Sequence, residues 1–300
     1  YSNAAGIVPV VRLKVPLDGQ TCFHDLIRGR ICMRNDQMDD FVLLKSDGYP
    51  TYHLGNVVDD HAMEISHIMR ADEWIPSTPR HVIMYDAFGW TPPLYAHLPV
   101  ILSPTGQGKM SKRKLVGADG REYNVRVREF RSAGYLAEAM FNFLALVGWA
   151  YDGKTDMLTR EQIVGAFDLD HVSKSPAKFT YDKLDWMNGM YIRQLDVEDL
   201  AKRLEPFFAS AGVEVSEETV RKMTPLIRER MVKLTDCVGL TDFFFVNELQ
   251  YDPQLLIQKG MTAEQARLVL ADSQDLLKGT EFIDTALEPV LRAKSDQLGL

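Results

Sequence analysis

The stretch Gly108–Lys114, GKMSKRK, gathers four basic side chains around a serine and a methionine, directly after the glycine-containing turn SPTGQG. Lysine ammonium groups are point charges on flexible stems, so a loop of this kind is suited to holding a polyphosphate while charge moves along it. Taken alone, such a basic string is at least as typical of a solvated surface loop. Its meaning therefore depends on the elements around it.

The charge near this motif differs in sign from that of the whole chain. The 300 residues carry a formal net charge of −8, whereas Lys109 to Arg131 hold eight basic residues against three acidic ones. Phosphates respond to the local field of a basic patch rather than to the sum over the chain. The acidic total therefore does not exclude a nucleotide or a nucleic acid as a ligand.

The sequence before the motif predicts an α/β domain. Short apolar runs predict β elements within 8–15 and 21–26, and strands within 41–50, 66–71 and 95–102. Helical spacing predicts a helix within 51–65 and another after Ser77 or Thr78 as N-cap, with Pro79 at the first helical position and Gly89 at the stop. Alternating strands and helices are typical of a parallel sheet, whose ligands lie beyond the carboxyl ends of the strands.

The strand pattern disappears after about residue 115, and the rest of the chain predicts helices. Amphipathic segments, several of them after Ser, Thr or Asp caps, occupy 133–149, 158–167, 183–192, 196–212, 216–239 and 262–277. We expect domain boundaries near Asp196 and in the polar stretch 250–260. The fold class is therefore α/β followed by all-α.

Composition is that of a soluble globular chain, with 46% hydrophobic and 25% charged residues, and no apolar run is long enough to span a membrane. We expect a cytoplasmic protein with no membrane partner. Cys22, Cys32 and Cys237 are far apart and form no CxxC or Cys/His cluster. This argues against a disulfide framework and against a zinc site, so we expect three buried thiols.

KMSKRK closely resembles the KMSKS signature loop of class I aminoacyl-tRNA synthetases, and it lies between an α/β region and a helical region as in that class. Residues 49–90 and 97–102 are similar to the second half of the catalytic domain of the bacterial glutamyl-tRNA synthetase family. GYLAEAMFNFLALVGW and DKLDWMNGMYIRQL are similar to its downstream helical region. The resemblance covers nearly the whole chain.

The resemblance implies a domain order. Residues 1–38 would end an acceptor-binding insertion, and 39–115 would form the second half of a Rossmann-like nucleotide-binding domain that carries the KMSKR loop. Residues 116–195 would form a helical stem-contact domain, and 196–300 an incomplete helical anticodon-binding domain.

The implied activity is that of a glutamate–tRNA ligase, which uses ATP to activate glutamate as glutamyl-adenylate and transfers it to the 3′ end of tRNA(Glu). Lys109 and Lys112 match the family's catalytic lysines, which stabilise charge on the departing pyrophosphate. Arg70 matches the arginine that pairs with the substrate side-chain carboxylate. The other matching residues are Tyr52 and Asn56 for the amino acid, and Glu73, Trp74, Met110, Ser111 and Arg113, with both lysines, for ATP.

Two other features can be explained by a structural role as well as by a functional one. Trp74 is as typical of packing as of a binding site. Asp59, Asp60 and His61 form an acidic cluster, but neighbours on a helix point in different directions, so we expect a structural role there. We expect no protein metal site; Mg²⁺ would arrive with ATP, held largely by phosphate and water.

Basic residues after the motif are the candidates for contacts with tRNA. Arg121, Arg126, Arg128 and Arg131 would give salt-sensitive contacts to the acceptor side. Arg228 and Arg230 would lie on the anticodon side, where splayed bases stack on arginine or aromatic side chains. A solvated helix face is an equally good reading of the second pair.

The chain also departs from the family pattern. It shows no HIGH-type motif and no first strand with its glutamate-binding arginine and serine, and it stops at SDQLGL. We therefore expect an internal part of a longer enzyme, and the resemblance implies a monomer. Two alternatives stay open: a glutaminyl-tRNA synthetase-like enzyme, which the helical second half disfavours, and a non-catalytic tRNA-binding module, which has no use for a glutamate pocket.

Overall fold

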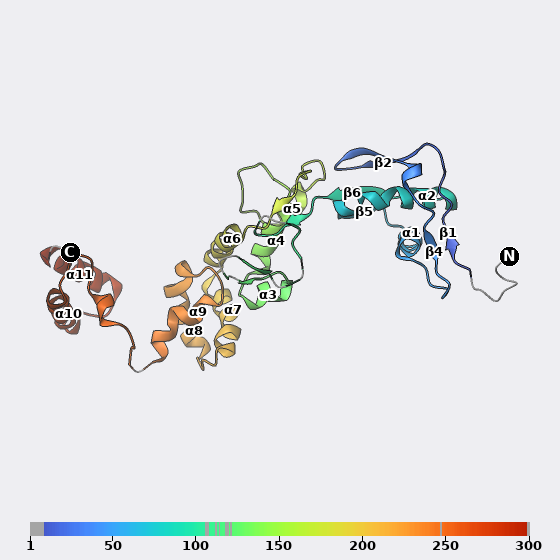
Figure 1. Cartoon of the computed structure of the whole chain (residues 1–300). Helices are drawn as coiled ribbons and strands as arrows, with labels where there is room; N and C mark the ends of the chain where they lie inside the picture. The colour runs from blue at the N-terminus through green and yellow to red at the C-terminus, as the bar shows by residue number, and fades with distance from the viewer. Residues whose placement is uncertain are drawn as a thin grey trace. The chain divides into compact units, whose positions relative to one another are not determined.

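The structure, a computed structural model, describes residues 9–298 except positions 106, 107, 112, 114, 118, 119, 121 and 247. The chain forms two compact units, Tyr1–Thr241 and Asp242–Leu300. Figure 1 colours the chain from its N-terminus to its C-terminus. Each unit is described by itself below.

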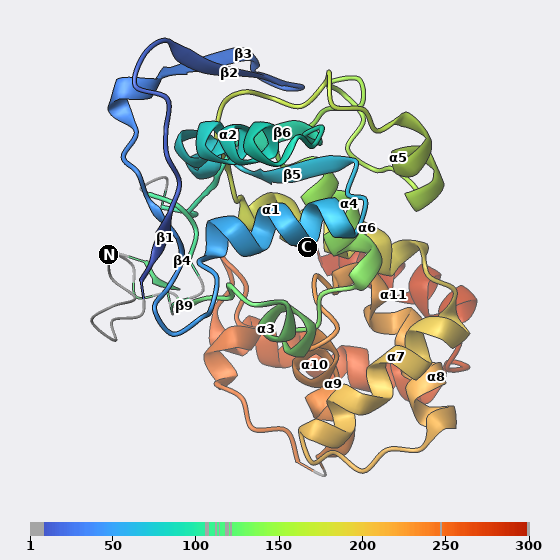
Figure 2. The same cartoon turned by 90° about the vertical axis from the view of Figure 1, so that its right-hand side faces the viewer.

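A four-stranded mixed sheet organises the beginning of the first unit. Its order is β3-β2-β6-β5; β6 is parallel to both β2 and β5, and β2 and β3 form an antiparallel hairpin. α2 packs against β2 and α1 (Figure 2). The bounds are β2 Gln20–Asp25, β3 Gly29–Arg34, α1 Tyr52–Ala62, β5 His67–Ala71, α2 Thr78–Phe88 and β6 Leu94–Leu98.

The predicted boundaries of α2 are confirmed in part. Ser77 is the N-cap residue, Pro79 lies in the first helical positions, and Gly89 ends the helix in the left-handed conformation, with φ of 71°. Glycine adopts this conformation without the steric cost that a Cβ brings. Ser77 caps without a side-chain hydrogen bond, because it also ends the 3₁₀ helix η3 (Asp72–Ser77) that leads into α2.

Two strand predictions are wrong in their pairing. The strand expected within 41–50 is β4 (Val42–Leu44), which pairs antiparallel with β1 (Val11–Arg12) and stays outside the parallel sheet. The strand expected over 95–102 is interrupted, because Pro99 has no N–H for a ladder. After it, β7 (Ile101–Leu102) pairs in parallel with β10 (Ala177–Lys178).

The expectation of three free thiols is wrong for two of the cysteines. Cys22 and Cys32 form a disulfide bond across the β2–β3 hairpin, whereas Cys237 is a buried free thiol. A separation of ten residues says nothing about pairing until the antiparallel register sets Cys22 directly opposite Cys32. That register depends on the sheet as a whole rather than on local sequence.

The helical character of the chain after residue 115 is confirmed, apart from the two-residue strands β8 (Leu115–Val116), β9 (Glu122–Tyr123) and β10. Thr159, Asp196 and Ser216 cap their helices through side-chain hydrogen bonds. The helix expected over 216–239 is broken by the 3₁₀ helix η4 (Arg228–Arg230). The helices are α3 Val127–Ser132, α4 Ala137–Ala145, α5 Arg160–Ala166, α6 Tyr181–Gln194, α7 Val197–Ser210, α8 Glu217–Ile227 and α9 Asp236–Thr241.

One core spans the expected boundary near Asp196. Leu136 and Ile192, before that point, pack in the same buried cluster as Leu200, Leu204 and Val220 after it. The two compact units divide after Thr241. The helices before and after Asp196 therefore support one another.

The second unit is helical. The 3₁₀ helices η5 (Asp242–Phe245) and η6 (Pro253–Leu256) precede α10 (Ala263–Lys278) and α11 (Asp284–Leu298), which pack against each other. Thr262 caps α10 by accepting a hydrogen bond from the Gln265 N–H. Within the described residues, no helix has the length and apolar character needed to cross a membrane.

Candidate active site

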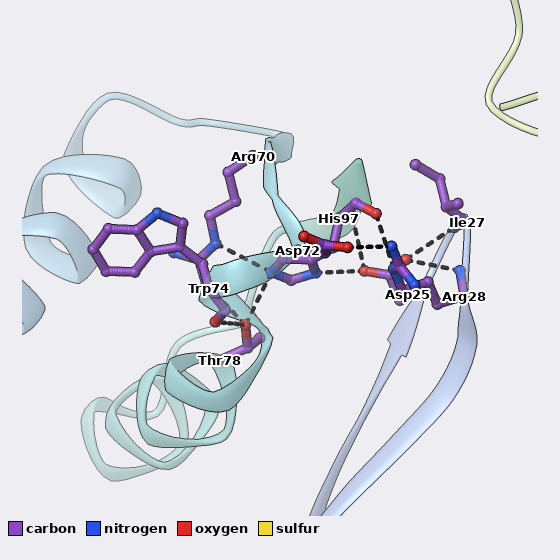
Figure 3. A network of polar contacts seen from close by, with 8 residues as sticks. All are labelled: Asp25, Ile27, Arg28, Arg70, Asp72, Trp74, Thr78 and His97. Carbon is purple, nitrogen blue, oxygen red and sulfur yellow. Dashed lines mark hydrogen bonds and ion pairs between the residues drawn. The ribbon is translucent and has the colours of Figure 1, made fainter. Parts of the chain in front are cut away.

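Arg70 lies one residue before the end of β5 and points among side chains from three other elements (Figure 3). Its Nε donates to Nε2 of His97, 3.2 Å away on β6, and its Nη2 donates to Oγ1 of Thr78, 2.8 Å away at the start of α2. The guanidinium carbon lies 5.7 Å from the centre of the Trp74 ring. Burial lowers the Arg70 pKa, although the tyrosine and aspartate side chains around it act in the opposite sense.

The side chains expected in the amino-acid pocket lie together around this arginine. The rings of Tyr52 and Trp74 are 5.1 Å apart, which joins the first turn of α1 to η3. Asn56, one turn further along α1, donates from Nδ2 to Oδ2 of Asp60 at 2.9 Å. Burial raises the Asp60 pKa, and the nearby charge of Arg70 opposes that effect. The cluster can therefore present a cation, an aromatic face and an amide to a small polar ligand.

The basic loop returns along the strand that precedes it. The Met110 N–H donates to the Ile101 carbonyl at 2.8 Å, and Lys109 forms a bridge opposite Leu102. Lys109 Nζ lies 2.5 Å from Oε1 of Glu73 in η3, so the loop reaches the Arg70 cluster. Met110 packs against the apolar cluster of the helical region.

The other loop residues contribute less to this arrangement. Ser111 Oγ accepts a hydrogen bond from the backbone N–H of Arg113 at 3.3 Å, and the Arg113 side chain is exposed. Lys112, the second catalytic candidate, lies outside the described residues. Of the lysines in the motif, Lys109 is therefore the one that lies within the described residues.

The acidic run at the end of α1 is divided among different partners. The His61 ring stacks on Trp90 with ring centres 3.8 Å apart, Asp60 is held by Asn56, and Asp59 is exposed. Over the described part of the chain, no group of three or more His, Cys, Asp or Glu side chains is arranged to hold a metal ion.

A buried polar network behind Arg70 escaped the sequence interpretation. Asp25, Thr78 and His97 are fully buried. Nδ1 of His97 lies 2.6 Å from Oδ2 of Asp25, and Arg28 pairs with Asp72 at 2.7 Å while its Nε donates to the His97 carbonyl (Figure 3). The available signal was a charged or titratable residue inside an apolar strand, as in TCFHDL and YAHLPV, because such groups are buried only with partners.

A second buried histidine lies beneath the same cluster. His81 of α2 is fully buried, and its Nε2 lies 2.9 Å from Nδ1 of His53 on α1. Burial lowers the His81 pKa to about 3, and the positive charge of Arg70 adds to the effect. Burial lowers the pKa of His53 as well. Both rings are therefore neutral at pH 7.

The arginines expected to contact tRNA lie in two places. Arg126, Arg128 and Arg131 are exposed on and beside α3, with Arg126 Nε 3.8 Å from a Glu129 oxygen. Arg121 lies outside the described residues. Arg230 is exposed and Arg228 half-buried on η4, where the expected continuous helix is broken.

Comparison with known proteins gives two family matches. The family "tRNA synthetases class I (E and Q), catalytic domain" matches residues 2–186, and "Anticodon binding domain" matches residues 199–300. The first match alone spans more than half of the chain.

Similar proteins of known name agree with these family matches. A glutamate–tRNA ligase of Dehalococcoides mccartyi is 50% identical over 298 residues, covering 97% of this chain and 59% of that protein. One from Roseiflexus castenholzii is 44% identical and is covered to the same 59%. The crystal structure of a glutamate tRNA ligase from Elizabethkingia meningosepticum in complex with its amino acid superposes with a TM-score of 0.81 at 32% identity, covering 97% of this chain and 59% of that one.

The chain thus spans about three fifths of the length of the relatives that it matches. Its fold, its basic loop and the two family matches lead to one conclusion. The chain belongs to the class I tRNA synthetases of the glutamate and glutamine (E and Q) family.

Proposed function

We propose that this chain carries the glutamate pocket and the phosphate-gripping loop of a glutamate–tRNA ligase. The observation that carries the proposal is the position of Arg70, between Trp74 and His97, together with the ion pair between Lys109 and Glu73, the residue next to Trp74. The name shared by the relatives at 44–50% identity supports glutamate rather than glutamine as the substrate.

In this proposal, Arg70 pairs with the side-chain carboxylate of glutamate through its planar guanidinium. Tyr52 and Asn56 contact the rest of the amino acid, and Trp74 and Glu73 border the ATP. Activation joins the α-carboxylate of glutamate to the α-phosphate of ATP and releases pyrophosphate. The two substrates are charged and need alignment more than a protein base, so positioning and charge stabilisation supply the rate.

Lys109 and Lys112 stabilise the negative charge that passes to pyrophosphate, and Met110, Ser111 and Arg113 shape the loop around it. Lys109 leaves Glu73 for the phosphates when ATP binds, since a polyphosphate carries more negative charge than one carboxylate. Mg²⁺ arrives with ATP, held by phosphate oxygens and water.

The tRNA follows the basic surface. Arg121, Arg126, Arg128 and Arg131 meet the acceptor side, and Arg228 and Arg230 meet the anticodon side, with domains dividing near residues 38, 115 and 195. Contacts of this kind go to phosphates and weaken with salt. We further propose a cytoplasmic monomer.

The test is glutamate-dependent exchange of pyrophosphate into ATP in the presence of tRNA. It is run with the chain and with a version extended to the length of its relatives. In each, Arg70→Leu is compared with the control Arg34→Leu, which removes an exposed arginine paired with Asp36. We expect exchange with L-glutamate that Arg70→Leu abolishes and Arg34→Leu retains. Exchange that responds to L-glutamine instead, or tRNA binding with no response to either amino acid, would overturn the proposal.

A further inference from the structure

We propose that His97 is the positioning residue of the amino-acid site: Asp25 holds it as a neutral imidazole, and it aims Arg70 while leaving the guanidinium charge available to an anionic side chain. The inference rests on the proposed function where it takes the partner of Arg70 to be the substrate carboxylate. What it says about the state of His97 stands on the hydrogen bonds alone.

The first step concerns Asp25, which is fully buried. Its Oδ1 accepts from the backbone N–H groups of Ile27 and Arg28, at 3.0 and 2.9 Å, and its Oδ2 accepts from that of His97 at 3.0 Å. Backbone N–H groups can only donate, so this carboxylate acts as an acceptor on both oxygens. We therefore assign the proton between them to Nδ1 of His97, 2.6 Å from Oδ2.

The second step concerns the other side of the ring. Nε of Arg70 can only donate, and it lies 3.2 Å from Nε2 of His97. The Thr78 hydroxyl accepts from Arg70 Nη2, and its own proton can go to the Trp74 carbonyl or to Nε2 of His97, each 3.1 Å away. Nε2 of His97 is then left as an acceptor. With Nδ1 protonated and Nε2 bare, the ring is the neutral Nδ1–H tautomer.

Burial acts in the same direction, because it lowers the His97 pKa against the raising effect of Asp25. Phe23 and Tyr95 flank the ring at centre distances of 6.0 and 6.3 Å. A protonated Nε2 would face the N–H of Arg70, which can only donate, and would leave the Thr78 hydroxyl as its acceptor while that oxygen also accepts from Arg70 Nη2. The contacts of this site and its burial therefore favour the neutral ring.

The third step concerns charge. Two arginines contact His97, and their own partners differ. Arg28 forms an ion pair with Asp72 at 2.7 Å, whereas the ion pairs found among the described residues include none with Arg70. Its hydrogen bonds to His97 and Thr78 go to an imidazole and a hydroxyl, both neutral. Tyr52 and Asp60 also act on its charge from nearby, and the Asp60 carboxyl is itself held by Asn56. A cation held by neutral acceptors keeps its attraction for an anion, so the site favours a carboxylate over a carboxamide.

The positions of Asp25, His97 and Arg70 in the sheet explain why the chain of contacts between them is held in place. Arg70 and His97 are direct partners in the pairing of β5 with β6, and Asp25 ends β2 on the other side of β6. The contacts thus cross three neighbouring parallel strands near their carboxyl ends. Removing the His97 acceptor would leave Arg70 Nε without its fixed partner and would free the guanidinium to rotate.

The test begins with the ring itself. Long-range ¹H–¹⁵N NMR of the chain labelled at histidine, with the signal assigned from a His97 variant, reports which ring nitrogen is protonated. We expect a protonated Nδ1 and a bare Nε2 at pH 7. A protonated Nε2, in the other tautomer or in the imidazolium, would overturn the inference, and this readout needs no glutamate.

Three substitutions then separate positioning from packing. His97→Gln keeps an acceptor near the Nε2 position, His97→Asn keeps only a donor near the Nδ1 position, and His97→Phe fills the space without either. We expect glutamate affinity to fall by about 10- to 100-fold in His97→Asn and His97→Phe, and to be largely rescued in His97→Gln. KM for glutamate should rise more than kcat falls, because the change affects binding of the side chain. His24→Asn, on the exposed face of β2, is the matched control.

The outcomes distinguish this inference from the proposed function. Equal losses in the Gln, Asn and Phe variants, with melting temperatures that fall together, would mean that His97 only packs. Were neither the chain nor its extended version to bind glutamate, the proposed function would fail while the ring state and the Arg70 Nε–H exchange rate still decided the positioning role. Slow exchange in the unsubstituted chain and in His97→Gln, with fast exchange in His97→Asn, supports it; equal exchange in all three overturns it.

Discussion

The Lys109 ammonium lies 2.5 Å from the Glu73 carboxylate, and this ion pair joins the basic loop after β7 to the 3₁₀ helix beside Arg70. Its side chains are 51% and 47% exposed. An exposed pair of this kind contributes about 0–1 kcal/mol to stability. The pair is therefore weak enough for a polyphosphate to displace, and it holds Lys109 near the place where the phosphates are needed.

Replacing Lys109 should affect chemistry and spare the fold. We expect Lys109→Ala to lower pyrophosphate exchange by about 10²- to 10³-fold, the range seen when one electrostatic donor to a transition state is lost. Its free energy of unfolding should change by less than about 1 kcal/mol. Lys45→Ala, which breaks the similarly exposed pair with Asp47 at 3.1 Å, is the control and should leave exchange unchanged. Equal effects of the two substitutions would contradict the proposed role.

Stability should fall in acid because of His81. Its folded-state pKa is about 3, below the value of about 6.5 in an unfolded chain. Between these values the unfolded state binds the extra proton, so the stability from neutral His81 is complete above about pH 6.5 and is lost as pH falls toward 3. Urea unfolding between pH 7.5 and 5 should show this slope, at most about 1.4 kcal/mol per pH unit for one group.

Substitution of that histidine tests the assignment. His81→Gln should flatten the pH dependence of the unfolding free energy, whereas His24→Gln, at an exposed position, should leave it as it is. The residual slope in His81→Gln then reports the other histidines whose pKa is lowered by burial, His53 and His97. An unchanged slope in His81→Gln would show that other groups cause the acid sensitivity.

Gly134 should tolerate no side chain. Its φ is 85°, and a Cβ there would meet the backbone nitrogens of Thr235 and Leu234 at 2.6 and 2.7 Å. Gly153, with φ of 73° and open space around it, suffers only the conformational strain. We expect Gly153→Ala to cost about 1 kcal/mol and Gly134→Ala clearly more, as measured by thermal unfolding. Similar costs for the two would mean that the α9 segment shifts to make room.

The three cysteines should differ in reactivity. Denatured and unreduced, the chain should show one free thiol by colorimetric titration, that of Cys237, and three after reduction. In the folded chain, burial raises the Cys237 pKa to about 12, so alkylation at pH 8 should be slow. Three thiols in the unreduced, denatured chain would contradict the Cys22–Cys32 bond.

Leu204 tests whether the helices on the two sides of Asp196 unfold together. It is fully buried in the core shared by α4, α6 and α7. We expect Leu204→Ala to destabilise by about 2–5 kcal/mol and to shift the unfolding reported by Trp186 on α6. Leu226→Ala, at a position 64% exposed, should do neither. A Trp186 signal that ignores Leu204→Ala would favour an independent domain after residue 196.

Local rules were sufficient for much of the fold. The caps at Thr159, Asp196 and Ser216 begin their helices where the sequence predicted, and Gly89 ends α2. These signals work because a cap satisfies backbone groups within three residues of itself. The type of most elements could therefore be predicted without knowledge of their neighbours.

Long-range pairing could not be predicted in the same way. β4 pairs with β1 rather than with the parallel sheet, and Cys22 meets Cys32 through the register of a hairpin. At the site, Arg70, Trp74 and Tyr52 were accessible from the family pattern. His97 was not, because its role depends on Asp25, 72 residues away in the sequence.

Because the strand is interrupted at Pro99, the segment that leads to Lys109 pairs with β10 and not with the four-stranded sheet. β7 pairs with β10, and Met110 packs on the helical cluster, so the loop with Lys109 is anchored on the helical region, whereas Arg70 is anchored in the sheet. Ile27, in the turn between β2 and β3, and Ala96 of β6 pack in one core with Trp149 and Leu158 of the helical region. This shared apolar core joins the region that carries the Lys109 charge to the sheet that carries the Arg70 charge. It is an alignment element, through which a small change in buried volume can alter how two substrates meet without touching either one.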